Sequence, residues 1–314
     1  MRTVYLGTSD FAVAVLYRLA GSDHAPSLVI TRPDRPAGRG RKLQSPPVAD
    51  AARALGIPVF QPAQLADEEA TAVVLAEKAD ALIVCAYGAI VREPLLSALP
   101  IYNVHPSLLP RWRGAAPIER AIAAGDAETG VSIMHLEAGL DSGPVALQES
   151  IAIEPGDTYG TLAERLAKLS GDLLLRALDA HPPVWTPQPE EGVTYAEKIT
   201  AEDRTLDPAA TAEVNERLVR ALSPHIGTRV ALPDGSMLGV HAARLLPTGD
   251  GPETDADDTP STTEAPTIPV TDDHTLHIDD ASVRLGALEL TRVQPAGGKA
   301  MDAGSWLRGR GGKR

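Results

Sequence analysis

The feature that most constrains the fold is a series of short, continuously apolar runs separated by helix-like segments. The runs span residues 2–7, 27–30, 81–87 and 101–104, and apolar residues recur at helical spacing in four further segments, residues 9–20, 48–55, 68–78 and 118–124. Strands that lack polar alternation are buried on both faces. This order therefore predicts an α/β fold with a doubly wound, mostly parallel, Rossmann-like sheet that helices cover on both sides.

The first turn of this predicted sheet argues against one common use of such a fold. It reads GTSDFA from Gly7 and lacks the G-x-G-x-x-G pattern, whose glycines let the backbone approach a dinucleotide pyrophosphate. An NAD-dependent oxidoreductase is therefore disfavoured. Ser9 or Asp10 instead offers an N-cap for the helix that follows. Ligands of doubly wound sheets bind beyond the carboxyl ends of the strands, so we expect the site there.

A second domain is predicted after a proline-rich stretch at residues 181–192, which follows a long amphipathic segment. Short strand candidates separated by turns come next, at residues 228–232, 238–244, 275–278, 282–285 and 289–292. Such a series predicts a small OB-like β-barrel. We expect a first domain at residues 1–185, a linker at 186–204 and a C-terminal barrel domain at 205–314.

Charge is distributed unevenly along the chain. The net charge of −13 argues by itself against a nucleic-acid partner. Eight acidic residues and no Lys or Arg fall between Asp250 and Asp273, in an acidic insert near residues 249–273 with the composition of a disordered loop. In contrast, residues 32–42 carry five cations and one acid, and residues 308–314 carry four cations. Two local basic patches are therefore expected on an acidic body.

The cysteine content and the apolar runs indicate a cellular compartment. Cys85 is the single cysteine and lies inside an apolar run, which predicts a buried free thiol and no cysteine metal cluster. No apolar run reaches the roughly 18 residues of a membrane span, and Asp10 interrupts the N-terminal run before a signal-like stretch develops. The sequence predicts a cytoplasmic protein.

The densest group of chemically active residues is the run IYNVHPSLLPRWRGAAPI, from Ile101 to Ile118. Residues two apart in a strand point to the same side, so the side chains of Asn103 and His105 can face one ligand. The prolines and turns that follow are expected to leave backbone groups free for a planar heterocycle. Asp141, in the loop AGLDSGP, supplies a carboxylate that can orient a histidine.

An amide beside a carboxylate-oriented histidine is suited to acyl transfer. A fixed N–H donor stabilises the charge that develops on a carbonyl oxygen by roughly 3–4 kcal/mol. Histidine moves protons between amines, and its carboxylate partner sets the tautomer. Such a site requires no serine or cysteine nucleophile.

The region from Asn103 to Val145 resembles the active-site region of the formyltransferases that use 10-formyltetrahydrofolate, and among them most closely those that act on methionyl initiator tRNA. The resemblance covers most of the chain. It includes GTSDFA near the start, TRPDRPAGRGRKL at residues 31–43, VTYAEKI at residues 193–199 and LTRVQPAGGKAM at residues 290–301.

The resemblance implies a role for each residue of the cluster. Asn103 would hold the formyl oxygen, His105 would manage the proton of the attacking methionyl α-amine, and Asp141 would orient and tune His105. The folate site would be lined by one run after a strand and by backbone after its neighbour, namely Ser107, Leu108, Leu109, Pro110, Tyr87 and Gly88. Because the folate co-substrate brings the one-carbon unit ready-made, no metal is implied.

The resemblance also gives a role to the basic loop and to the second domain. The loop would enter the tRNA acceptor stem through its cations, Arg35, Arg39, Arg41 and Lys42, with Arg39 foremost. The C-terminal barrel would bind tRNA. Nothing in the sequence requires more than a monomer or indicates a membrane partner.

Two alternatives remain open from the residues themselves. A formyltransferase with the same chemistry could act on a small amine such as glycinamide ribonucleotide, although such a substrate needs neither the basic loop nor a second domain. A non-catalytic RNA- or folate-binding module is the other alternative. It would have no use for the proton relay of Asn103, His105 and Asp141.

Overall fold

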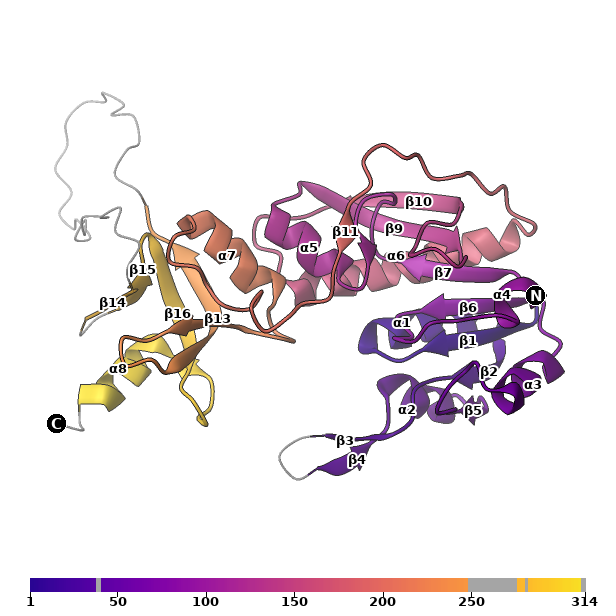
Figure 1. Cartoon of the computed structure of the whole chain (residues 1–314), viewed down its shortest axis with the longest axis horizontal. Coiled ribbons are helices and arrows are strands. Elements are labelled where there is room, and N and C mark those ends of the chain that lie inside the picture. Colours follow the sequence, from indigo (N-terminus) through magenta and orange to yellow (C-terminus); the bar gives the residue numbers. More distant parts are fainter. Residues whose placement is uncertain (38–40, 248–275, 280–281, 312–314) are drawn as a thin grey trace. The chain divides into compact units, whose positions relative to one another are not determined.

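A computed structural model describes residues 1–37, 41–247, 276–279 and 282–311 (Figure 1). Arg39 and the predicted acidic insert at residues 249–273 lie outside the described residues.

The chain divides into two compact units. The first comprises residues 1–121, 126–155 and 161–198, and the second comprises residues 122–125, 156–160 and 199–314. Residues 186–198 pack with the first unit, and the predicted boundaries at residues 185 and 204 stay a prediction.

A seven-stranded sheet forms the centre of the first unit, in the order β10-β9-β7-β6-β1-β2-β5. Its strands are β1 (Thr3–Gly7), β2 (Pro26–Ile30), β5 (Val59–Phe60), β6 (Ala81–Cys85), β7 (Ile101–His105), β9 (Glu128–His135) and β10 (Val145–Ala152). The strands β5, β2, β1, β6 and β7 pair in parallel with their neighbours in this order. At the other edge, β9 pairs antiparallel with β7, and β10 pairs antiparallel with β9. The predicted mostly parallel sheet is confirmed.

Burial explains which of these strands the sequence reveals. All residues of β1, β6 and β7 are buried, so these strands form continuous apolar runs. The edge strand β10 is different, because residues 148–150 at its centre are exposed. It has no apolar run, and the sequence did not predict it.

Helices flank the sheet on both faces, as Figure 1 shows for the first unit. They are α1 (Asp10–Ala20), α2 (Pro47–Ala54), α3 (Glu68–Ala76), α4 (Leu95–Ala98), α5 (Pro117–Ala124) and α6 (Tyr159–Asp179). The predicted N-cap is confirmed at Ser9, whose side chain accepts the Ala12 N–H. Two small ladders complete the unit, an antiparallel one of β3 (Arg35–Ala37) with β4 (Lys42–Gln44) and a parallel one of β8 (Arg113–Gly114) with β11 (Tyr195–Ala196).

The second unit is an antiparallel sheet that curls into an OB-like half-barrel, as predicted. Its strands are β12 (Thr228–Ala231), β13 (Met237–Leu245), β14 (Leu276–Ile278), β15 (Val283–Leu285), β16 (Leu288–Gln294) and β17 (Met301–Asp302), and its helices are α7 (Ala212–Ala221) and α8 (Ala303–Gly311). The sheet order is β12-β13-β16-β15-β14, with β17 on β16. Apolar side chains from these strands form a core with Trp306 and Leu307 of α8.

Candidate active site

Two polar side chains are buried at the carboxyl end of β7. Asn103 and His105 are 8% and 4% exposed, in a strand that lies between β6 and β9. A buried amide and a buried imidazole both need partners, since an unpaired polar group there costs roughly 1–3 kcal/mol. The loop between β9 and β10 supplies a carboxylate for both.

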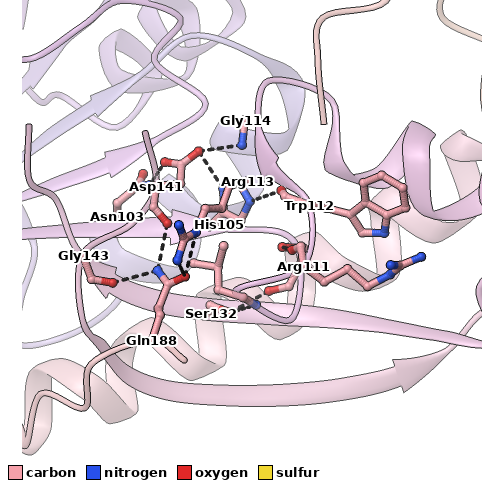
Figure 2. Close-up of polar contacts among 12 residues, drawn as sticks. Asn103, His105, Arg111, Trp112, Arg113, Gly114, Ser132, Asp141, Gly143 and Gln188 are labelled. Carbon is pink, nitrogen blue, oxygen red and sulfur yellow. Dashed lines mark hydrogen bonds and ion pairs between the residues drawn. The ribbon is translucent and has the colours of Figure 1, made fainter. Parts of the chain in front are cut away.

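Asp141 completes the predicted cluster (Figure 2). Asn103 Nδ2 donates to Asp141 Oδ1 at 3.4 Å, and Asp141 Oδ2 lies 3.7 Å from His105 Nδ1. The backbone N–H of Gly114 donates to the same Oδ2 at 2.9 Å. The structure thus brings together Asn103, His105 and Asp141, which are 38 residues apart at the extremes.

The second nitrogen of His105 identifies its tautomer. Nε2 lies 2.8 Å from the carbonyl oxygen of Trp112. A carbonyl oxygen can only accept, so Nε2 carries the hydrogen. In the neutral ring, Nδ1 then has a free lone pair beside the Asp141 carboxylate. A proton taken up at Nδ1 would make His105 a cation next to that negative charge.

The predicted folate-lining residues lie in two loops that follow adjacent strands. Tyr87 and Gly88 come after β6, and Ser107 to Pro110 come after β7. Thr8 Oγ1 donates to the Tyr87 carbonyl at 2.8 Å. Burial raises the pKa of the Tyr87 phenol, and Arg32 opposes this more weakly, so the phenol stays protonated at neutral pH.

Open space lies beside Gly88. Its φ is +72°, and a side-chain carbon added there would meet no atom within 4 Å. Ala86, two residues earlier, also has a left-handed φ of 44°. This backbone can therefore approach a planar ligand closely.

The expectation that the backbone of residues 107–110 is free is wrong in part. Ser132 Oγ donates to the Ser107 carbonyl at 2.6 Å, and this hydroxyl oxygen in turn accepts the Leu109 N–H at 3.1 Å. The Leu109 carbonyl accepts from Gln148 Nε2 at 2.7 Å. Side chains of β9 and β10 satisfy these groups, which a sequence pattern does not reveal. They rigidify the loop but leave fewer groups for a ligand.

The side chains of Arg111 and Trp112 point away from the cluster of Asn103, His105 and Asp141 (Figure 2). Arg111 makes two hydrogen bonds to Asp126, at 2.8 and 2.6 Å, and Trp112 Nε1 donates to the same carboxylate at 2.7 Å. The bond to Asp126 raises the pKa of Arg111. These residues border a pocket of about 260 Å³ lined by Leu108, Arg111, Trp112, Asp126, Ala127, Glu128 and Thr129.

The cations of the predicted tRNA loop lie on the β3–β4 hairpin, apart from Arg39, which is outside the described residues. Arg35, Arg41 and Lys42 are all exposed. Arg41 adopts a left-handed φ of 47° in the turn immediately before β4. The structure does not bring these residues together with Asn103, His105 and Asp141 through any hydrogen bond or ion pair among the described residues.

Neither a metal-ligand group nor a long apolar helix occurs in the part of the chain that the structure describes. Within it, no three His, Cys, Asp or Glu side chains are grouped in a way that could hold a metal ion. No helix there has both the length and the apolar character needed to cross a membrane. The predicted buried free thiol is confirmed at Cys85.

Comparison with known families defines the class of protein. A family model described as formyl transferase matches residues 1–178, and a model described as formyl transferase, C-terminal domain, matches residues 198–311. The chain therefore belongs to the formyl transferase family and is a transferase enzyme.

Several relatives that are more than 40% identical to this chain are methionyl-tRNA formyltransferases. The one from Methylobacterium sp. (strain 4-46) is 44% identical over 99% of this chain and 96% of its own length. That from Halorhodospira halophila is 42% identical over 98% of this chain and 96% of its own. The structure of a methionyl-tRNA formyltransferase from Clostridium thermocellum shares the fold, with a TM-score of 0.58 at 14% identity over 78% of this chain and 93% of its own.

Proposed function

We propose that this protein transfers the formyl group of 10-formyltetrahydrofolate to the α-amine of methionyl initiator tRNA. The observation that carries the proposal is the contact of Asn103 and His105 with Asp141 at the carboxyl end of β7, in a chain closely related to methionyl-tRNA formyltransferases. The bound co-substrate supplies an activated formyl group. The loop after β6, with Tyr87 and Gly88, and residues 107–110 after β7 would hold it.

Asn103 stabilises the negative charge on the formyl oxygen as the amine adds. Its Nδ2 bond to Asp141 is long, at 3.4 Å, so the amide can shift to a stronger acceptor. Such a donor acts mainly on the transition state, since the oxygen gains charge only there. Because the side chain is buried, water competes little for the N–H.

His105 takes the proton that the amine loses. The Trp112 carbonyl occupies Nε2–H, so the accepting atom is Nδ1. Asp141 lies 3.7 Å from this atom and stabilises the cation that forms. The bond between the formyl carbon and the folate nitrogen would then break, and the proton held at Nδ1 would pass to that nitrogen, which makes tetrahydrofolate the product.

The basic hairpin and the second unit would provide contacts for a large RNA substrate. Arg35, Arg41 and Lys42 are exposed cations suited to phosphate contacts, and Arg39 belongs to the same predicted set. A small amine needs neither the hairpin nor a C-terminal unit. We also propose a cytoplasmic location, since both substrates are soluble, and a monomer, since the described catalytic cluster is formed within one chain.

The test is transfer of a labelled formyl group from 10-formyltetrahydrofolate by the purified protein. Three acceptors are offered in parallel: methionyl initiator tRNA, methionyl elongator tRNA and glycinamide ribonucleotide. We expect transfer to the initiator alone. Transfer to the nucleotide would retain the chemistry and overturn the substrate, and no transfer to any acceptor would leave a binding module.

A further inference from the structure

The 188–196 segment, which has no role in the mechanism above, contacts both polypeptide segments that flank the reacting groups. β11 within it pairs with β8, and the Arg113 N–H donates to the Thr194 carbonyl at 2.9 Å. The N–H groups of Ala115 and Ala116 both donate to the carbonyl of Ala196, at 2.8 and 3.1 Å. A stretch expected to be part of a linker thus forms a ladder beside the site.

Thr194 fixes the residue that faces His105. Its Oγ1 accepts the Trp112 N–H at 2.8 Å. Trp112 has a left-handed φ of 63°, which costs a residue with a Cβ about 1–3 kcal/mol and needs support from its surroundings. This conformation directs the Trp112 carbonyl to His105 Nε2. The Thr194 hydroxyl therefore acts on the tautomer of His105 through one intervening residue, Trp112.

Gln188 fixes the residue on the other side of the ring (Figure 2). Its Nε2 donates to the carbonyls of Asp141 and Gly143, both at 2.8 Å, and its Oε1 accepts from Arg113 Nε at 3.0 Å and Nη2 at 2.8 Å. Every hydrogen-bonding atom of the amide is used. Asp141 is also left-handed, with a φ of 44°. Gln188 therefore connects the Asp141 turn to the β8 segment that faces it.

We propose that Gln188 and Thr194 are positioning residues that keep His105 as the Nε2–H tautomer, with Nδ1 toward Asp141. Neither residue needs to touch a substrate. The kinetic consequence rests on the proposed formyl transfer, whereas the tautomer is a property of the folded chain. Asp141 is the charged group that faces Nδ1, and Arg113 lies behind it through Gln188.

Four variants separate positioning from general stability. Thr194→Val keeps the shape and removes the acceptor, whereas Thr194→Ser keeps the acceptor. Gln188→Glu keeps the acceptor for Arg113 and removes both donors to the Asp141 turn. Thr186→Val is a matched control in the same part of the chain, because its side chain is exposed and its backbone pairs with Val145.

The first measurement is the nitrogen spectrum of the histidine rings in full-length, nitrogen-15-labelled protein, with the His105 signals assigned by their loss in His105→Gln. We expect the Nε2–H pattern for His105 in the wild type, Thr194→Ser and Thr186→Val. Thr194→Val and Gln188→Glu should show a mixture of both tautomers. An unchanged pattern in Thr194→Val and Gln188→Glu would overturn the proposal.

The second measurement is the rate of formyl transfer to methionyl initiator tRNA as a function of pH. Thr194→Val and Gln188→Glu should lower kcat by about 10- to 100-fold with little change in the KM for the folate, and should move the acidic limb of the profile. A loss of kcat with an unmoved profile and the wild-type tautomer would mean a structural role only. If the wild type shows the Nε2–H pattern without any transfer, the proposed function fails while the tautomer assignment stands.

Discussion

At the scale of single residues, Asn103 is the most direct test of the chemistry. Asn103→Ala should lower kcat by about 100- to 1,000-fold, the usual effect of removing one donor from a developing oxyanion. The KM for 10-formyltetrahydrofolate should change little, because the bond strengthens only in the transition state. Steady-state kinetics check both constants. Equal losses in the two would assign Asn103 to ground-state binding.

Asp141 tests the proton relay. Asp141→Asn keeps the size of the side chain but removes the charge that lies 3.7 Å from His105 Nδ1. The imidazolium that forms as the amine loses its proton is then less stabilised. We expect a lower kcat and an acidic limb shifted to lower pH in the rate profile. A lower rate with the wild-type profile would exclude Asp141 from the relay.

The sequence indicates the cluster of Asn103, His105 and Asp141 because two of its members sit two apart in a strand and the third falls in a loop of a recognisable run. It does not indicate Gln188 or Thr194. Their bonds go to backbone atoms 45 to 82 residues away, at Gly143, Asp141 and Trp112. A side chain that bonds to a distant backbone leaves no local spacing to read. The motif VTYAEKI at residues 193–199 can be recognised in the sequence, but the bond of Thr194 to the Trp112 N–H is apparent only in the folded chain.

At the scale of secondary-structure elements, β6 carries a pH-sensitive group. Burial of Cys85 raises the pKa of its thiol to about 12, with a smaller opposing effect of a hydrogen bond from Tyr5. The folded chain therefore keeps a proton that the unfolded chain loses near pH 9. The protonated thiol contributes its full amount to the free energy of unfolding below about pH 9. This contribution should decline between about pH 9 and about pH 12, by about 1.4 kcal/mol per pH unit.

Denaturant unfolding of the first unit between about pH 8 and pH 10.5 measures this decline. The free energy of unfolding should fall less steeply with pH in Cys85→Ala than in the wild type, and the difference should correspond to one proton. Identical slopes would mean that Cys85 does not contribute to the pH dependence.

The cations of the β3–β4 hairpin should contribute to the binding of tRNA and not to the binding of the folate. Changing both Arg41 and Lys42 to Ala removes two exposed cations. We expect the KM for methionyl initiator tRNA to rise and its dependence on salt to become less steep by about two counterions, since each phosphate contact releases roughly one. Folate binding should stay at the wild-type value. A matching loss of folate affinity would show that the hairpin also supports the site.

Elements were predictable where local pattern and tertiary packing agree. The buried strands β1, β6 and β7 are apolar throughout, and the five strand candidates of the second unit all appear. α8 was not predicted, because its sequence AGSWLRGRG contains three glycines, which have low helix propensity. Burial of Trp306 and Leu307 in the core of the second unit stabilises this helix despite its low intrinsic propensity.

At the scale of the whole molecule, acidic and basic residues are concentrated in different parts of the chain. The net charge is −13, yet the described hairpin carries exposed cations, Arg35, Arg41 and Lys42, which would offer a polyanion a local site of approach. The acidic majority limits non-specific attraction to other nucleic acids. A substrate must therefore match particular places on the protein, which agrees with an enzyme that selects one tRNA among many.

The ladder between β8 and β11 determines where this protein can be joined to another. The first unit runs to Lys198, and Thr194 and Ala196 lie within its last five residues. A chimera that exchanges C-terminal domains after residue 185 would import foreign residues at positions 188 and 194, whereas one spliced after Lys198 keeps the native ones. We expect only the later splice to retain the wild-type nitrogen pattern of His105. The part of the chain that must be kept together as one catalytic unit therefore extends past α6, its last helix, to Lys198.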